Sequence, residues 1–181
     1  MTWVRGLVLG SHIRFPAVQT TRFIATRTGI STGAPARWPN NCSAWGIQPS
    51  DRVATLMRNH YAHLEAYFGI PCCGGIVHTL NFRLHPDELV FVVKHAEDRV
   101  LILDQDLLPQ YEKIRHKVNI SRVLVFASSE SAGPDYDSYE EFLAGASGRF
   151  EYPKIDEDDA AAMAYTSGTT GNPKGVLYSH R

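Results

Sequence analysis

One segment decides the fold of this sequence, and it reads Tyr165-Thr166-Ser167-Gly168-Thr169-Thr170-Gly171-Asn172-Pro173-Lys174-Gly175. It follows directly on a run of small residues, 160–165, which is typical of a strand. Glycines let the backbone turn its N–H groups toward phosphate oxygens, hydroxyl side chains add further donors, and Lys174 adds a mobile positive charge. The segment therefore predicts a loop that holds a polyphosphate.

Two better-known phosphate loops do not match. A Walker A loop needs Gly where Pro173 stands and a hydroxyl residue where Gly175 stands, and the dinucleotide pattern G-x-G-x-x-G is missing. Residues 176–178 indicate a second strand after the loop instead of a helix. Composition alone would also suit a flexible turn between two strands, but the order of the residues favours the phosphate loop.

Upstream of the loop, short runs of Val, Ile and Leu alternate with helix-like segments. This is the α/β pattern of stacked β-α-β units around a mainly parallel sheet. We expect strands at 52–57, 76–80, 99–103, 122–126 and 160–165. We expect helices from an Asn59 cap to about Gly69, from His85 onward, at 107–117 and at 139–144.

Several residues set the limits of these elements. Pro71 should stop the first helix, because proline lacks the N–H that a helix interior uses. Leu89, Val92 and Val93 recur at helical spacing and should face the core. The Ser, Gly, Pro and Asp content of 128–137 indicates an exposed loop.

The first 47 residues form a separate, atypical segment, with 48–181 as the domain proper. Residues 1–50 contain five Arg and no Asp or Glu, and 29–44 show turn formers without periodicity, so we assign no secondary structure there. Pro16 interrupts any long amphipathic helix, so we expect a cytoplasmic protein, with a mitochondrial transit peptide as the alternative. The basic end lacks aromatic stacking platforms, so we expect no nucleic-acid partner.

Length and composition limit the classes of protein to which the chain can belong. At 181 residues with 44% hydrophobic and 20% charged content, the chain suits one globular domain or most of one. No apolar run approaches the roughly 18 residues of a transmembrane span. Cys42, Cys72 and Cys73 fit neither a disulfide framework nor a zinc site, so we expect buried free thiols.

At this point the sequence resembles a known family. Residues 165–181 are similar to the phosphate-binding signature of the adenylate-forming superfamily, which includes acyl-CoA synthetases, peptide-synthetase adenylation domains and luciferases. The segments 51–56, 63–68, 78–81 and 95–100 are similar to its medium- and long-chain fatty acid–CoA ligase branch. The resemblance covers about 48–181.

The resemblance implies an acid–thiol ligase that joins a fatty acid to coenzyme A. ATP and the carboxylate give an acyl adenylate and diphosphate, and the acyl group then passes to the CoA thiol. By this resemblance Thr166 holds Mg²⁺, and Lys174 and Thr166 are the catalytic candidates. The residues expected around the β- and γ-phosphates are Thr166, Ser167, Gly168, Thr169, Thr170, Gly171, Lys174 and Gly175.

The resemblance also implies what this chain lacks. The adenine and ribose elements, the magnesium-binding glutamate and the mobile C-terminal domain follow the loop in the family. We therefore expect a partial N-terminal domain, with the C-terminal domain absent and no ligase activity from this chain alone. A homodimer is possible for the full-length enzyme. We assign His180 a structural role, and Asp98 and Arg99 a solvated turn without catalytic work.

Two other functions remain open. One is an enzyme that adenylates another acyl or aryl acid, which would share the loop. The other is a non-catalytic fragment with residual phosphate binding. The segments 63–68 and 78–81 favour the fatty acid ligase over the first alternative.

Overall fold

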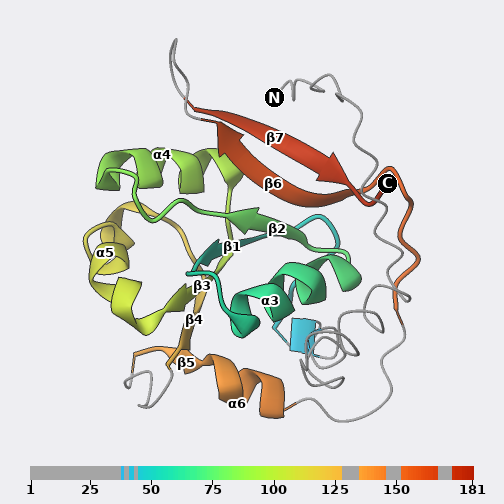
Figure 1. Ribbon diagram of the computed structural model, residues 1–181, viewed down its shortest axis with the longest axis horizontal. Coiled ribbons are helices and arrows are strands. Elements are labelled where there is room, and N and C mark those ends of the chain that lie inside the picture. Colours follow the sequence, from blue (N-terminus) through green and yellow to red (C-terminus); the bar gives the residue numbers. More distant parts are fainter. Residues whose placement is uncertain (1–37, 39–40, 43–44, 128–134, 146–151, 167–172) are drawn as a thin grey trace.

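The computed structural model describes residues 38, 41–42, 45–127, 135–145, 152–166 and 173–181. These residues form a seven-stranded sheet in the order β5-β4-β3-β1-β2-β6-β7 (Figure 1). All neighbouring strands are parallel except β6 and β7, which are antiparallel. The strands are β1 (Arg52–Leu56), β2 (Ile76–Thr79), β3 (Val100–Asp104), β4 (Arg122–Phe126), β5 (Asp137–Ser138), β6 (Ala160–Thr166) and β7 (Lys174–Ser179). The predicted mainly parallel α/β sheet is confirmed.

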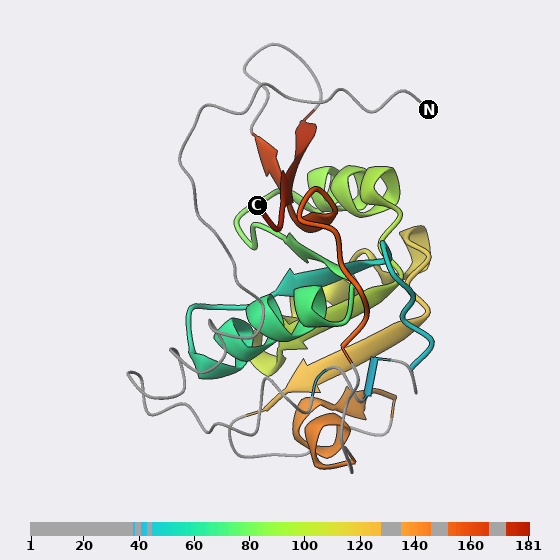
Figure 2. The same cartoon turned by 90° about the vertical axis from the view of Figure 1, so that its right-hand side faces the viewer.

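Helices cover both faces of this sheet, as Figures 1 and 2 show. One apolar core packs α3 (Tyr61–Cys72) and α6 (Tyr139–Ala144) on one face. A second core packs α4 (Pro86–Ala96) and α5 (Leu108–Glu112) on the other. Two short 3-10 helices, Gln105–Leu107 and Arg115–Lys117, flank α5. The predicted continuous helix at 107–117 is therefore broken into shorter pieces.

The central strands β1 and β3 are largely apolar because both of their faces are buried. On β1, Val53 contributes to the core under α3, while its neighbour Ala54 contributes to the core under α4. On β3, Ile102 and Leu103 divide in the same way. Successive side chains on a strand point to opposite faces, so one strand supplies both cores.

Helix α4 begins with a capping box at the predicted helix start. The Glu88 carboxylate accepts a hydrogen bond from the His85 backbone N–H at 3.0 Å, and the Asp87 N–H donates to the His85 ring at 3.4 Å. Its end is marked by Glu97, whose φ is 56°. Leu89, Val92 and Val93 are buried, so their predicted core positions are confirmed.

Helix α3 differs from its prediction at both ends. It is capped by His60 in extended conformation, not by Asn59, and it continues through Pro71 to Cys72. Proline removes only one helical hydrogen bond, and here that loss falls in the last turn. The Gly75 N–H then donates to the Ile70 carbonyl at 3.1 Å and closes the helix.

The segment before the sheet is anchored in the core through Trp38, which is fully buried. Its indole N–H donates to the Tyr139 hydroxyl at 3.2 Å, and its ring lies 4.8 Å from that of Phe142. The Asn41 amide also donates to the Phe142 carbonyl. Trp38, Asn41 and Cys42 are helical, so the prediction of no secondary structure across 29–44 is wrong at these three residues.

A disulfide adds a covalent link to this anchor. Cys42 is bonded to Cys73 at the end of α3, with their Cα atoms 6.6 Å apart, and Cys72 is buried beside them. The expectation of free thiols is therefore wrong for Cys42 and Cys73. Sequence spacing could not pair them, because their proximity depends on how the chain around Cys42 packs against the end of α3.

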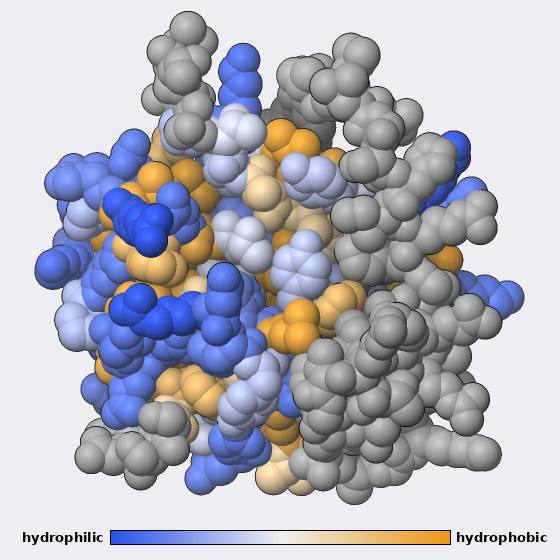
Figure 3. All heavy atoms as spheres, in the orientation of Figure 1, coloured by the Kyte–Doolittle hydropathy of each residue, from blue (hydrophilic) through white to orange (hydrophobic). Residues whose placement is uncertain are grey.

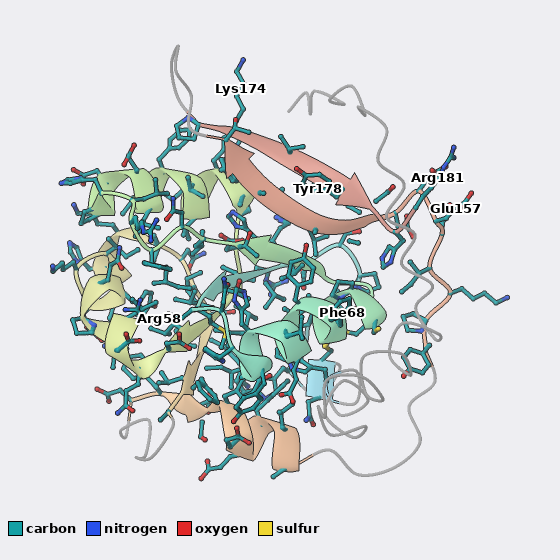
Figure 4. The ribbon with its side chains drawn as sticks, in the orientation of Figure 1. Arg58, Phe68, Glu157, Lys174, Tyr178 and Arg181 are labelled. Atoms are coloured by element: carbon teal, nitrogen blue, oxygen red, sulfur yellow. A yellow bond between two sulfur atoms is a disulfide. The ribbon has the colours of Figure 1, made fainter. Side chains whose placement is uncertain are left out.

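The antiparallel strand β7 forms one edge of the sheet and carries exposed apolar side chains. Leu177 is 43% exposed and Tyr178 is 55% exposed. Figure 4 labels Tyr178 on β7 and Phe68 on α3, and Figure 3 shows apolar residues on this face. Burial, and then the nearby Tyr178, raises the pKa of Tyr67 on α3. No helix in the described part of the chain combines the length and apolar character of a membrane span.

We expect this edge to cause self-association. Replacing Leu177 and Tyr178 with Lys puts charge on an open strand edge, which opposes pairing between copies. Sedimentation velocity at rising protein concentration should show reversible association of the parent chain and little association of the L177K/Y178K variant. Tyr152→Lys is the control, because Tyr152 is 42% exposed but lies outside this hairpin. Equal association of all three proteins would contradict the prediction.

Candidate functional site

The two ends of the predicted phosphate loop face each other across the β6–β7 hairpin. Thr166 ends β6, Lys174 begins β7, and the two are cross-strand partners. The strand predicted after the loop is confirmed. The predicted phosphate contacts at Ser167, Gly168, Thr169, Thr170 and Gly171 lie outside the described residues.

Both end residues of the loop present their side chains to solvent. The Thr166 hydroxyl donates to the Lys174 carbonyl at the long distance of 3.5 Å, and both residues are exposed. Lys174 extends away from the sheet in Figure 4. Because Thr166 is at the carboxyl end of a parallel strand, the loop emerges at the edge where open α/β sheets bind ligands. A hydroxyl and an ammonium group are therefore available together at that edge.

Gly175 is fixed by packing at the base of the loop. A Cβ on Gly175 would lie 3.1 Å from Cζ of Tyr165, its partner across the hairpin. The Tyr165 ring thus covers the Gly175 backbone. The sequence predicted a phosphate contact for Gly175, and the structure supplies a second reason for glycine at this position.

Tyr165 is held on its other side by α4. Its hydroxyl lies 2.6 Å from Nδ1 of His95, and the two rings meet edge to face at 5.8 Å. Burial, then the nearby Asp98 carboxylate, raises the pKa of Tyr165 to about 12, against a smaller opposing effect of Arg52. Tyr165 therefore stays protonated at neutral pH and can donate to His95.

A buried hydrogen-bonded pair, His78 and Asp98, lies next to Tyr165. Nδ1 of His78 is 2.9 Å from both carboxylate oxygens of Asp98, and neither side chain is exposed. The His78 ring is 5.2 Å from that of Tyr165. Burial raises the pKa of Asp98, while the hydrogen bond from His78 opposes that shift.

The predicted solvated turn at Asp98 and Arg99 is therefore wrong for Asp98. Its carboxylate turns inward to His78, whereas Arg99 reaches Asp51 at 3.6 Å. The sequence contained one missed signal: a His in a strand and an Asp before the next strand, which are brought together by the parallel pairing of β2, β1 and β3.

A second polar group at the carboxyl ends of β1, β3 and β4 was not predicted. His60 Nε2 lies 2.8 Å from the Asp104 carboxylate, which also accepts from the Arg58 backbone N–H at 2.7 Å. The His60 ring stacks on Phe126 at 4.7 Å. Asp104 directly ends a buried strand, and polar residues at strand ends are the signal that could have identified this group.

His63, in the same region, makes stability depend on pH. Its ring bonds the Thr55 hydroxyl at 3.0 Å, and burial lowers its pKa below 6.5, against a smaller opposing effect of its bond to the Arg58 carbonyl. The unfolded chain therefore takes up a proton near pH 6.5 before the folded chain does, so the free energy of unfolding falls as pH falls below 6.5. Urea unfolding at pH 7.5 and 5.5 should show a smaller decrease in the free energy of unfolding for His63→Gln than for the parent chain. An equal decrease in the two proteins would contradict this prediction.

His180 lies at the far end of the hairpin from Lys174. Its backbone N–H donates to the Asp159 carbonyl at 3.1 Å, and burial lowers its pKa. Its ring lines a small cavity with Lys154 and Ser50. The distance along β7 separates His180 from the loop. Among the described residues there is no cluster of three or more His, Cys, Asp or Glu that could hold a metal ion.

Comparison with known proteins places this geometry in a family. Residues 43–181 match the family described as AMP-binding enzyme. The chain is 47% identical over 138 residues to a long-chain-fatty-acid–CoA ligase of Thermus thermophilus, with 76% of this chain and 25% of the relative covered. It is 45% identical over 141 residues to a 3-methylmercaptopropionyl-CoA ligase of Ruegeria pomeroyi, with 75% and 26% covered. The chain thus spans about a quarter of the length of these curated relatives.

Solved structures agree with the sequence relatives. The crystal structure of the anthranilate CoA ligase AuaEII in complex with anthranoyl-AMP superposes with a TM-score of 0.77 at 26% identity. The match covers 82% of this chain and 28% of that one. The sheet is thus that of the N-terminal domain of adenylate-forming enzymes. Because its family model matches most of the sequence, the chain belongs to the AMP-binding enzyme family, and the two curated relatives are acyl-CoA ligases.

Proposed function

We propose that this chain supplies the phosphate-binding half of the ATP site in a fatty acid–CoA ligase. The observation that carries the proposal is the pairing of Thr166 with Lys174 at the carboxyl edge of the parallel sheet. That pairing puts a hydroxyl and a positive charge at the two ends of a glycine-rich loop. An acid–CoA ligase needs a phosphate-binding site, because the carboxylate must first be joined to AMP before the CoA thiol can attack the acyl carbon and displace AMP.

In the proposed reaction the carboxylate attacks the α-phosphorus of ATP and diphosphate leaves. Negative charge then grows on phosphate oxygens, and donors fixed before the reaction stabilise it. We assign Lys174 to that charge and Thr166 to Mg²⁺, with Ser167, Gly168, Thr169, Thr170, Gly171 and Gly175 completing the phosphate contacts. Bound Mg²⁺ would supply further charge neutralisation. The exposed hydroxyl of Thr166 and the exposed ammonium of Lys174 suit these roles.

A fatty acid is the proposed acyl substrate. The matched relatives include long-chain and medium-chain fatty acid–CoA ligases at 47% and 38% identity, beside the methylmercaptopropionyl ligase at 45%. CoA is the proposed acceptor, and residues 48–181 are the proposed domain, which follows an atypical N-terminal segment 1–47. We further propose a homodimer for the full-length enzyme and a cytoplasmic location, where the Cys42–Cys73 disulfide would be reduced.

The experiment fuses this chain to the remaining three quarters of the Thermus thermophilus ligase and assays the fused protein for formation of acyl-CoA. With ATP, Mg²⁺ and CoA, we expect acyl-CoA from medium- or long-chain fatty acids. If the fused protein releases AMP only with an aryl acid, the proposed fatty acid is rejected. An aryl substrate would then be favoured, which is the kind of acid named for the AuaEII neighbour. No AMP with any acid, from a folded protein, would reject the proposed function.

A further inference from the structure

A hydrogen bond connects the base of the phosphate loop to α4. The Tyr165 hydroxyl lies 2.6 Å from His95 Nδ1, and His95 is in the last turn of α4. The adjacent Phe91 ring stacks on His95 at 5.5 Å and limits its rotation. The imidazole is thus held in place from within its own helix.

Tyr165 connects this hydrogen bond to the two strands at the base of the loop. It precedes Thr166 in β6, and its ring covers Gly175, the residue after Lys174 in β7. One side chain therefore touches the backbone on both arms of the hairpin immediately below the loop. The ring lies so close over the Gly175 backbone that a Cβ there would be only 3.1 Å from Cζ, so the contact requires glycine.

The buried pair of His78 and Asp98 closes the other side of Tyr165. The His78 ring packs at 5.2 Å from the tyrosine ring, and its orientation is fixed by two 2.9 Å contacts with Asp98. Arg52 adds a link to the end of α4, since its Nε donates to the Ala96 carbonyl at 2.6 Å. The tyrosine is therefore held between a rigid base and His95.

We propose that His95 and Tyr165 are positioning residues for the phosphate loop: their hydrogen bond fixes the angle between the β6 and β7 arms and thereby sets affinity for Mg·ATP. The inference rests on the proposed function, because it assigns these residues to the same loop. Neither residue needs to touch ATP. The hydrogen bond acts through the Tyr165 ring and Gly175.

The test is a double-mutant cycle in this chain, with Mg·ATP affinity measured by calorimetry. His95→Leu and Tyr165→Phe should each weaken binding roughly three- to tenfold, the range that one hydrogen bond supplies. The double variant should be no weaker than the weaker single variant, because both remove the same bond. His95→Asn, whose amide can occupy the place of Nδ1, should restore most of the affinity. His116→Leu is the matched control, since His116 is exposed and lies in a different element.

A second measurement separates this inference from the proposed function. Hydrogen exchange without ATP, followed by mass spectrometry, should show faster exchange at 164–166 and 174–176 in His95→Leu and Tyr165→Phe, and parental exchange in His95→Asn. If the parent chain binds no Mg·ATP while this exchange pattern holds, the proposed function fails for the chain and the positioning of the hairpin stands. Unchanged exchange, or additive losses of affinity in the double variant, would overturn the inference.

Discussion

Replacing Gly69 with Ala should lower the free energy of unfolding by about 3 kcal/mol, because a methyl group there collides with a buried Trp. A Cβ on Gly69 would lie 2.3 Å from Cγ of Trp38 and 2.5 Å from its Cβ. Trp38 is fully buried against Tyr139 and Phe142, so it cannot move aside without leaving the core. Urea unfolding followed by fluorescence would measure the loss.

Two further variants make this prediction specific. Gly145→Ala is the matched control, because a Cβ there would meet nothing nearer than 3.6 Å, and we expect a change within about 0.5 kcal/mol. In a Trp38→Ala background the space opposite residue 69 is empty, so Gly69→Ala should cost little. A full loss in that background would show that the cause is not the contact with Trp38.

Replacing Lys174 with Ala should reduce adenylation about 100-fold when this chain forms the first quarter of a complete ligase. Removing one fixed donor of charge from a transition state costs about 3 kcal/mol, which is two powers of ten in rate. Exchange of labelled diphosphate into ATP measures that step without CoA. Thr166→Val should reduce the same exchange, and raising Mg²⁺ should recover part of the loss if Thr166 binds the ion.

The control for this prediction is another exposed lysine. Lys113, which follows α5, is exposed, and Lys113→Ala should leave exchange unchanged. Unchanged exchange in Lys174→Ala would reject the assigned role. A decrease confined to thioester formation would also contradict it, because the proposed charge develops during adenylation.

The layout of the sheet could be predicted because its local signals agree with its tertiary structure. The runs at 100–104 and 122–126 are apolar enough to be buried on both faces, and His85-Pro86-Asp87-Glu88 is a strong helix start. Pro71 was one exception, since its effect depends on its place within the helix. The presence of a proline in the sequence does not show how many helical residues precede it, and therefore not which turn of the helix it occupies.

The contacts around Tyr165 were harder to predict than the pairing of Thr166 with Lys174. Thr166 and Lys174 belong to one contiguous motif, so their proximity follows from a single hairpin. The pairs His78–Asp98 and His95–Tyr165 are 20 and 70 residues apart, and only the order of the strands brings them together. For the same reason, no spacing rule could pair Cys42 with Cys73.

The pairing of β6 with β2 has a consequence for the order of folding. β1 to β4 pair among themselves and lie before residue 127, whereas Ala162 must find Val77 across a long stretch of intervening chain. Chains fold from the N-terminal side during synthesis, and distant pairings form slowly. We therefore expect β6 and β7 to join the sheet after β1 to β4, and the proposed phosphate loop to be placed with them. ATP bound at that loop would favour molecules in which β6 and β7 are in place, and would suppress opening of the β6–β7 hairpin.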